Sequence, residues 1–193
     1  MNDDYYQQNA QRFFDDTVGV DMSVVYQPFL KHLKPGARIL DAGCGSGRDI
    51  KTFSEMGFEV EAFDASAELV DRAKQLTGKH VEVMHFQEVT AVEQYDGIWC
   101  CASLLHVPEE ELPEVMRLLA RALKPGGFWY MSFKYGRGER VKDGRQFTDM
   151  DEEGIREITG RLEAMTLVEM WTTADRRTER DEVWINAVLG KSF

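Results

Sequence analysis

The chain has 193 residues, of which 43% are hydrophobic and 30% are charged, proportions that are typical of a soluble globular domain. Its formal net charge of −11 disfavours nucleic acids and other large polyanions as partners. No apolar run approaches the ~20 residues of a membrane span, and the three cysteines show neither a paired nor a metal-binding spacing. We therefore expect one domain in the cytoplasm, with no membrane segment and no metal site.

Hydrophobic periodicity divides the chain into helices and strands. Two helices are expected first, over 3–17 and 22–33. Five strands follow, over 37–42, 59–64, 81–86, 96–102 and 127–134. Further helices are expected over 47–56, 66–77, 110–123 and 151–162, and two last strands over 165–173 and 182–189. This order predicts an α/β fold, in which a mostly parallel sheet carries helices on both faces and ends in an antiparallel strand pair.

A glycine-rich turn follows the first of these strands. Asp41 lies near the end of the strand, and glycine then occupies every second position, at Gly43, Gly45 and Gly47. Gly43 permits the sharp turn, Gly45 lets a ligand approach the backbone, and Gly47 begins a helix whose free N–H groups favour a negative ligand group. The G-x-G-x-x-G dinucleotide motif is excluded, because Arg48 stands where its third glycine would be. A phosphate-binding Gly-Lys-Ser/Thr loop is also absent.

The order of motifs along the chain resembles that of the class I S-adenosylmethionine (SAM) methyltransferases. The motifs are Asp-x-Gly-x-Gly-x-Gly, an acid ending the second strand, the fourth strand, and the turn before the fifth: 41–47, Asp64, Tyr95–Ala102 and Leu123–Gly127. Segments 102–108 and 132–136 resemble small bacterial methyltransferases known as tellurite-resistance-like. The resemblance implies SAM as cofactor and a Rossmann-like sheet of seven strands, mostly parallel with an antiparallel C-terminal strand.

The resemblance also implies how the chain is divided. The whole of 1–193 would be a single methyltransferase domain. Residues 1–34 would form a helical lid, 35–135 the cofactor-binding half and 136–193 the substrate-side half.

Cofactor contacts are expected just after each parallel strand, where ligands bind in such sheets. Asp64 is placed to accept hydrogen bonds from ribose hydroxyls, and Asp41 resembles the family acid that orients the methionine part of SAM. Both acids could instead be turn or helix caps. Arg48 could reach the cofactor carboxylate or point into solvent. The expected cofactor-binding residues are Asp41, Gly43, Cys44, Gly45, Ser46, Gly47, Arg48, Asp64, Ala65, Gln87, Glu88 and Ala102.

Two residues are candidates for proton transfer, which is needed only if the acceptor carries a proton. His106 follows the fourth strand and could take a proton near neutral pH, although it could also be a structural histidine. Tyr135 follows the fifth strand. Cys100 and Cys101 lack the preceding proline of C5-type nucleic-acid methyltransferases, so we interpret them as small buried thiols.

The segment 134–145 is basic in an otherwise acidic chain. Its cations are candidates for binding an oxyanion of the substrate: Lys134, Arg137, Arg140 and Arg145. The alternative is a solvated mobile loop. Arg176, Arg177 and Arg180, between the last two strands, could add to this charge.

Together these features predict a SAM-dependent methyltransferase that transfers a methyl group to a small-molecule nucleophile, with an anionic substrate favoured by the basic segment. Two alternatives remain open at this stage: an RNA or protein methyltransferase that docks through the basic segment, and a non-catalytic SAM-binding protein. The sequence leaves the acceptor atom and the oligomeric state undetermined.

Overall fold

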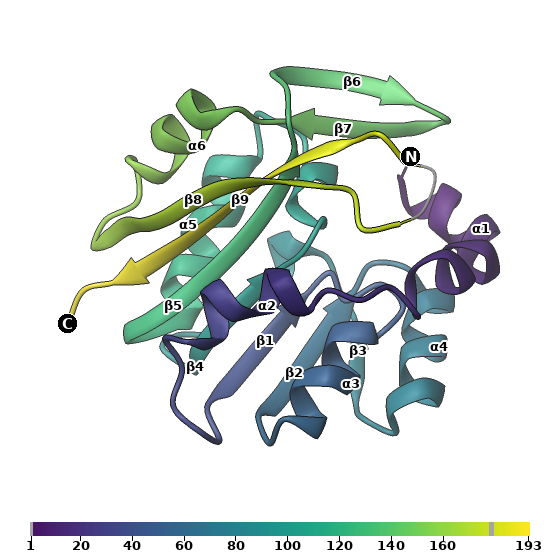
Figure 1. Ribbon diagram of the computed structural model, residues 1–193, viewed down its shortest axis with the longest axis horizontal. Helices are drawn as coiled ribbons and strands as arrows, with labels where there is room; N and C mark the ends of the chain where they lie inside the picture. Colours follow the sequence, from purple (N-terminus) through teal and green to yellow (C-terminus); the bar gives the residue numbers. More distant parts are fainter. Residues whose placement is uncertain (1, 178–179) are drawn as a thin grey trace.

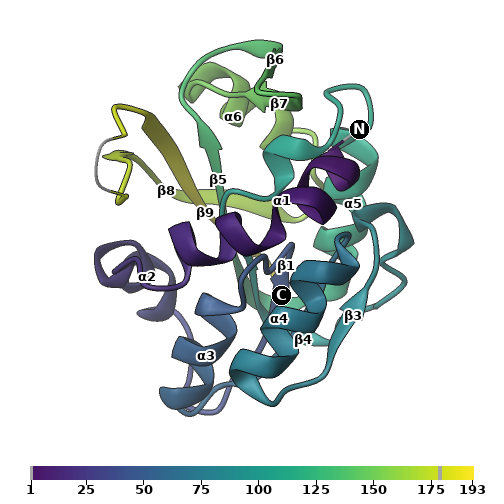
Figure 2. The ribbon, with the colours of Figure 1, turned by 90° about the vertical axis from the view of Figure 1, so that its right-hand side faces the viewer.

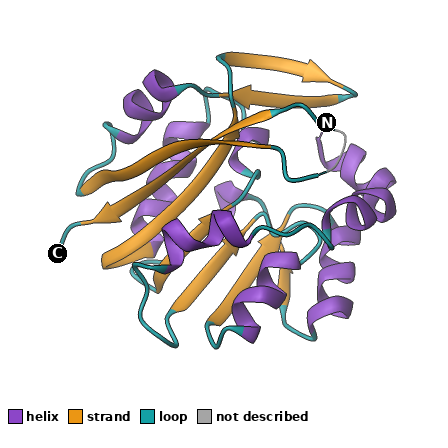
Figure 3. Cartoon of the chain, viewed as in Figure 1, coloured by secondary structure: helices purple, strands orange, loops and turns teal. Residues whose placement is uncertain are grey.

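A seven-stranded sheet forms the centre of the protein in the computed structural model, which describes residues 2–177 and 180–193 (Figures 1 and 3). Its strands in chain order are β1 (Arg38–Ala42), β2 (Glu59–Asp64), β3 (Val81–Val83), β4 (Tyr95–Cys100), β5 (Leu123–Lys134), β8 (Met165–Ala174) and β9 (Val183–Lys191). The spatial order is β3-β2-β1-β4-β5-β9-β8. Strands β1 to β5 run parallel, and β9 is antiparallel to both neighbours. The predicted sheet of seven strands, mostly parallel with an antiparallel C-terminal strand, is confirmed.

Helices cover both faces of this sheet (Figures 1 and 2). One face packs against α2 (Ser23–Leu30), α3 (Arg48–Glu55) and α4 (Ala67–Thr77). The other face packs against α5 (Leu112–Ala122) and α6 (Glu152–Thr159). The first helix, α1 (Asn2–Thr17), instead contacts α4 and one strand of a separate hairpin.

Alternating side chains along the strands build the two cores. In β4, Ile98 joins the cluster under α5, whereas the next residue, Trp99, joins the cluster under α2 and α3. Successive strand residues point to opposite faces, so a fully buried parallel strand must be apolar at every position. On the α2 face, Trp99 stacks on Tyr130 of β5, with ring centroids 3.9 Å apart.

The basic segment is not a loop, which corrects the alternative considered from the sequence. It forms a hairpin of β6 (Gly138–Lys142) and β7 (Arg145–Asp149), seen in green at the top of Figure 1. Asp143 and Gly144 connect the strands with φ of 52° and 75°. Asp-Gly is a preferred two-residue hairpin turn, because both positions need positive φ. This signal was present in the sequence and was overlooked.

Other differences concern the ends of elements. The third strand stops at Val83, and the chain then forms the short 3-10 helix η1 (Phe86–Glu88). A second 3-10 helix, η2 (Leu104–His106), follows β4. Helix α1 is interrupted at Asn9, whose φ of −114° and ψ of 16° are not helical. These short turns place side chains at the carboxyl edge of the sheet.

Candidate functional site

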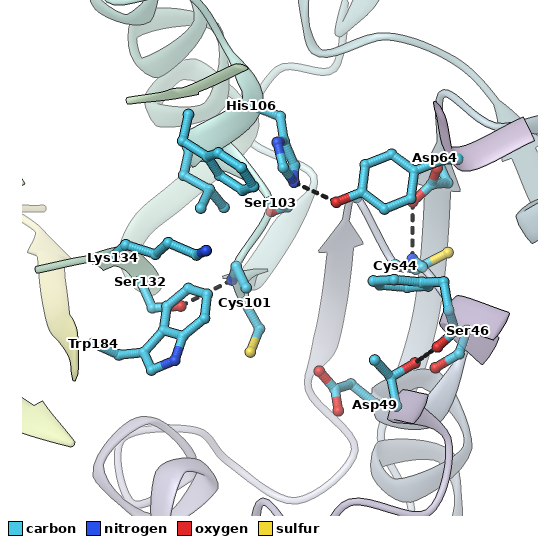
Figure 4. A pocket seen from close by; sticks show the side chains of 18 of the residues that line it. Cys44, Ser46, Asp49, Asp64, Cys101, Ser103, His106, Ser132, Lys134 and Trp184 are labelled. Carbon is cyan, nitrogen blue, oxygen red and sulfur yellow. Dashed lines mark hydrogen bonds between the residues drawn. The ribbon is translucent and has the colours of Figure 1, made fainter. Parts of the chain in front are cut away.

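A cavity of about 270 Å³ lies at the carboxyl ends of β1, β2, β4 and β5. Such an edge is where open α/β sheets bind their ligands. Figure 4 shows side chains on two sides of the cavity. Asp64, Cys44 and Ser46 come from the β1 and β2 ends, and Lys134 and Trp184 lie across from them on β5 and β9. Helix α1 adds Tyr6 and Phe13 to the wall.

The glycine turn of the cavity is required by close contacts as well as by backbone angles. Gly43, Gly45 and Gly47 have φ of 78°, 54° and 80°, a region that side-chain-bearing residues rarely adopt. A Cβ on Gly43 would lie 2.5 Å from the Cβ of Ser103, and one on Gly47 would lie 2.9 Å from the Cβ of Ala73. The glycines therefore let the turn pack tightly between β4 and α4 while exposing its backbone.

Asp64 connects this turn to the next helix. Its carboxylate accepts hydrogen bonds from the backbone N–H of Gly45 at 2.8 Å and of Ser66 at 2.9 Å. The same side chain lines the cavity. Capping and ligand contact are therefore compatible at this residue, because a carboxylate has more acceptor sites than these two bonds use.

Asp41 lies beneath the turn and is not one of the described residues that line the cavity. It is buried, and its Oδ2 atom has no hydrogen-bond partner in the described part of the chain. Burial, reinforced by the nearby Asp49 carboxylate, raises the pKa of Asp41 well above its ordinary value. A buried carboxyl oxygen without a partner is costly. The turn thus holds an acid that a nearby cation would stabilise.

Arg48 forms part of the cavity wall and does not extend into solvent. Its guanidinium donates to Asp49 at 2.6 and 3.0 Å. Asp49 also accepts from the Tyr26 hydroxyl at 2.6 Å and from Trp99 Nε1 at 2.7 Å. Burial alone would raise the pKa of Asp49, but Arg48 and these donors lower it. This supporting network joins residues of α2 and β4 that are far apart in the sequence, so it could not be predicted from the sequence.

Two expected cofactor residues, Gln87 and Glu88, lie side by side on the η1 turn but differ in their relation to the cavity. Gln87 lines the cavity, and its side-chain amide donates to Glu111. Glu88 is not among the cavity residues, and its carboxylate accepts from the backbone N–H of His85 at 2.7 Å. Of the remaining expected cofactor residues, those that line the cavity are Gly43, Cys44, Gly45, Ser46, Ala65 and Ala102.

His106 is held from two sides. Its Nδ1 lies 3.2 Å from the backbone carbonyl of Gln146, and its Nε2 lies 2.7 Å from the hydroxyl of Tyr6. Burial lowers the pKa of His106 to about 4, and the charges of Arg145 and Lys134 act in the same direction. The imidazole is therefore neutral at physiological pH and can act as a base.

The basic residues divide between the cavity and the outer surface. Lys134 and Arg145 line the cavity. Lys134 is 8% exposed in its side chain and binds Glu182 at 2.8 Å. Arg137 and Arg140 do not line the cavity. Arg137 instead forms an ion pair with Glu153 at 2.8 Å, and Arg140 forms one with Asp149 of β7.

Tyr135 also lies apart from the cavity residues. It is 45% exposed, and its hydroxyl donates to Glu152 at 2.8 Å. Several cavity residues were missed because their contribution depends on the fold: Ser103, Ser132, Lys142, Phe147 and Trp184. Arg176, Arg177 and Arg180 do reach the cavity wall, as the sequence had suggested.

The cysteines are free thiols. Burial raises the pKa of Cys44, Cys100 and Cys101, which disfavours reactive thiolates. Within residues 2–177 and 180–193, no group of three or more His, Cys, Asp or Glu side chains is arranged to hold a metal ion. No helix in the same residues is both long and apolar enough to cross a membrane.

Part of the chain matches known proteins in sequence. Residues 39–127 match a family model described as a methyltransferase domain. The chain is 36% identical over 105 residues to the ubiquinone biosynthesis O-methyltransferase of Xanthomonas oryzae pv. oryzae, and 35% over 106 residues to that of Xanthomonas campestris pv. campestris. These alignments cover 50% and 51% of this chain but only 43% of each relative, so the chain matches less than half the length of either.

Solved structures resemble the fold over nearly the whole chain. The 1,6-didemethyltoxoflavin-N1-methyltransferase of Burkholderia thailandensis, with bound 1,6-didemethyltoxoflavin and S-adenosylhomocysteine, has a TM-score of 0.79 and 20% identity, covering 98% of this chain and 85% of its own. The magnesium protoporphyrin IX methyltransferase of Synechocystis has a TM-score of 0.76 and 19% identity, and the match covers 99% of this chain and 98% of that one. The [4+2]-cyclase SpnF has a TM-score of 0.77 and 14% identity, and the match covers 99% of this chain and 95% of that one.

These findings agree with one another. The domain match falls on the glycine turn and the strands that follow it, the curated relatives align over half of the chain, and the seven-stranded sheet extends the likeness to the C-terminal strands. Residues 39–127 thus resemble a methyltransferase domain, and the chain as a whole has the fold of the class I SAM-dependent methyltransferases.

Proposed function

We propose that this protein transfers a methyl group from SAM to a nucleophile of a small molecule. The observation that carries the proposal is the cavity itself. On one side it has the glycine turn and Asp64, and on the other it has a base, His106, with two cations, Lys134 and Arg145. A cofactor on the first side would meet a substrate on the second, and this juxtaposition supplies most of what methyl transfer requires.

The residues of the turn fit SAM in charge and shape. Asp64 would accept hydrogen bonds from the ribose hydroxyls, and Gln87 would contact the cofactor from the η1 turn. Arg48 offers a guanidinium to the cofactor carboxylate, and the buried Asp41 oxygen without a partner suits a nearby ammonium or sulfonium. The glycines leave room for a ligand to lie against the backbone. When bound, SAM supplies a methyl group already activated by a positively charged sulfur.

The acceptor side favours a small substrate with oxyanion character. Lys134 and Arg145 face the cavity, and arginine can bind a carboxylate or phosphate through two parallel bonds. Helix α1 and the β6–β7 hairpin both contribute to the wall, which limits the size of the substrate. The net charge of −11 disfavours nucleic acid. The Xanthomonas relatives are named as O-methyltransferases, which supports an oxygen acceptor.

The fold alone does not establish methyl transfer. A protein described as a [4+2]-cyclase has a similar fold, with a TM-score of 0.77. What argues against a non-catalytic SAM-binding protein is the His106 imidazole at the cavity, whose Nε2 accepts a hydrogen bond from the Tyr6 hydroxyl and is therefore unprotonated.

Methyl-labelled SAM distinguishes these functions. The full chain is incubated with labelled SAM and with separate small-molecule, RNA and protein fractions of a bacterial extract. We expect label to pass to the small-molecule fraction only. Label in RNA or protein would establish the first alternative. Binding of S-adenosylhomocysteine without any label transfer from SAM would support the non-catalytic one.

A further inference from the structure

A tyrosine of the protein forms a hydrogen bond with His106, the candidate base at the cavity. The hydroxyl of Tyr6, on α1, lies 2.7 Å from Nε2 of His106. The other ring nitrogen, Nδ1, lies 3.2 Å from the carbonyl oxygen of Gln146. Because a carbonyl can only accept, Nδ1 carries the proton and Nε2 is the acceptor. The hydroxyl of Tyr6 therefore donates to the lone pair that a base would use.

A cation lies over the ring of Tyr5, whose centroid is 5.4 Å from that of Tyr6. The guanidinium of Arg145 lies 4.5 Å from the ring centroid of Tyr5 and 5.2 Å from that of Phe147. The side chain is 16% exposed, its ion pair with Asp143 spans 3.8 Å, and its buried Nε has no hydrogen-bond partner in the described part of the chain. This contrasts with Arg177, whose guanidinium binds Asp175 at 2.6 Å. No close carboxylate in the described part of the chain neutralises Arg145, so its charge can attract an anionic ligand in the cavity.

The electrostatics of Tyr6 reflect these neighbours. Burial raises the pKa of Tyr6 to about 12, whereas Arg145 lowers it through its charge and a hydrogen bond. Asp64 and Tyr5 act in the raising direction. Tyr6 therefore stays a neutral phenol, and its hydroxyl lies between a hydrogen-bond acceptor, His106, and a nearby positive charge, Arg145.

We propose that the Tyr6 hydroxyl occupies the position at which the methyl acceptor binds. The acceptor is then a phenol or a similarly acidic hydroxyl, which replaces the Tyr6 hydroxyl between His106 and Arg145. The inference rests on the proposed function and specifies its substrate class. When the acceptor is in place, its O–H group donates to Nε2 of His106, and the proton passes to that nitrogen as the oxygen reacts. With SAM bound, an electron pair of the oxygen would form the bond to the methyl carbon while the carbon–sulfur bond breaks and leaves its pair on sulfur, and Arg145 would stabilise the negative charge that builds up on the oxygen.

The helix that carries Tyr6 has a point at which it can bend. Asn9 interrupts α1 with non-helical angles, and its side chain donates to the carbonyl of Tyr5 at 2.9 Å. Tyr5 and Tyr6 precede this point, whereas Phe13 follows it and packs against Gly45. The first part of the helix can therefore move away from His106 while the second part keeps its contact with the glycine turn.

The test compares three small probes on the full chain saturated with S-adenosylhomocysteine. p-Cresol carries the phenol of tyrosine, toluene lacks the hydroxyl, and p-toluidine replaces it with an amine. In Tyr6→Phe the competing hydroxyl is gone. We expect the affinity for p-cresol to rise roughly 3- to 10-fold, the range that corresponds to one neutral hydrogen bond. The affinity for toluene should stay unchanged.

A second variant keeps the test valid if the Tyr6 variant is poorly folded. In His106→Leu, which is similar in volume, p-cresol and toluene should bind alike, because the acceptor nitrogen is gone. His80→Gln is the matched control, since the His80 side chain is 81% exposed, and it should retain the preference for p-cresol.

Two results would overturn the inference. One is a p-cresol affinity that is unchanged or weaker in Tyr6→Phe, which would make Tyr6 a structural or substrate-contacting residue. The other is wild-type protein that binds p-toluidine as tightly as p-cresol. Wild-type protein that fails to bind S-adenosylhomocysteine would instead contradict the proposed function, so the two failures can be told apart.

Discussion

The carboxylate of Asp64 combines two tasks that sequence reasoning had treated as alternatives. It holds the backbone of Gly45 and Ser66, and it faces the cavity. We expect Asp64→Ala to weaken S-adenosylhomocysteine binding roughly 10- to 150-fold, because hydrogen bonds to charged groups contribute about 1.5–3 kcal/mol. Titration calorimetry measures this. Asp71→Ala, on the exposed surface of α4, is the control and should bind like wild type. Equal affinity in a folded Asp64 variant would leave Asp64 as a cap only.

His106 makes stability depend on pH. Its pKa falls from the ordinary 6.5 to about 4 in the folded protein, chiefly through burial. The unfolded chain therefore takes up a proton at higher pH than the folded chain does. The associated stability is fully present above pH 6.5 and is lost as pH falls from about 6.5 to about 4, by roughly 2–4 kcal/mol.

Urea unfolding at pH 7, 5.5 and 4.5 measures this loss. In His106→Gln the acid-induced decrease in unfolding free energy should be smaller than in wild type by that amount. His80→Gln, at an exposed position, should follow the wild-type curve. A wild-type curve that is parallel to that of His106→Gln would mean that His106 titrates normally.

At the scale of elements, the β6–β7 hairpin brings basic residues of the segment 134–145 to the cavity. Arg140 and Arg145 lie on the same face of the hairpin, because Arg140 pairs with Phe147 and residues two apart on a strand share a face. Arg145 lines the cavity, whereas Arg137 and Arg140 are paired with acids outside it. Charge along the segment predicted a cationic region, but the folded structure is needed to show which of its cations line the cavity and which are paired with acids.

Benzoate is a simple probe of this cationic region. We expect Arg145→Met to weaken benzoate binding to the S-adenosylhomocysteine-saturated protein at least about tenfold, since a charge-assisted hydrogen bond contributes roughly 1.5–3 kcal/mol. Arg117→Met is the matched control, because Arg117 lies exposed on α5 and pairs with Glu114. Calorimetry that gives equal benzoate affinity for both variants would remove Arg145 from the oxyanion site.

At the scale of the whole molecule, the sequence predicted the mostly parallel sheet, the helices on both of its faces and the position of the glycine turn. It could do so because these depend on local periodicity and on glycines that no other residue can replace. The network around Asp49 and the contact between Tyr6 and His106 could not be predicted. They join residues 50 and 100 positions apart, and only the assembled fold brings these together.

Binding of the cofactor product is the most direct test of the account. At 100 times its dissociation constant, S-adenosylhomocysteine should stabilise the folded protein by about 2.7 kcal/mol. For a chain of this length, that corresponds to a rise in melting temperature of roughly 5–11 °C, measured by calorimetry or by thermal-shift fluorescence. NADH at the same concentration should produce no comparable shift. A shift with NADH and none with S-adenosylhomocysteine would contradict the assignment of the glycine turn as a SAM site.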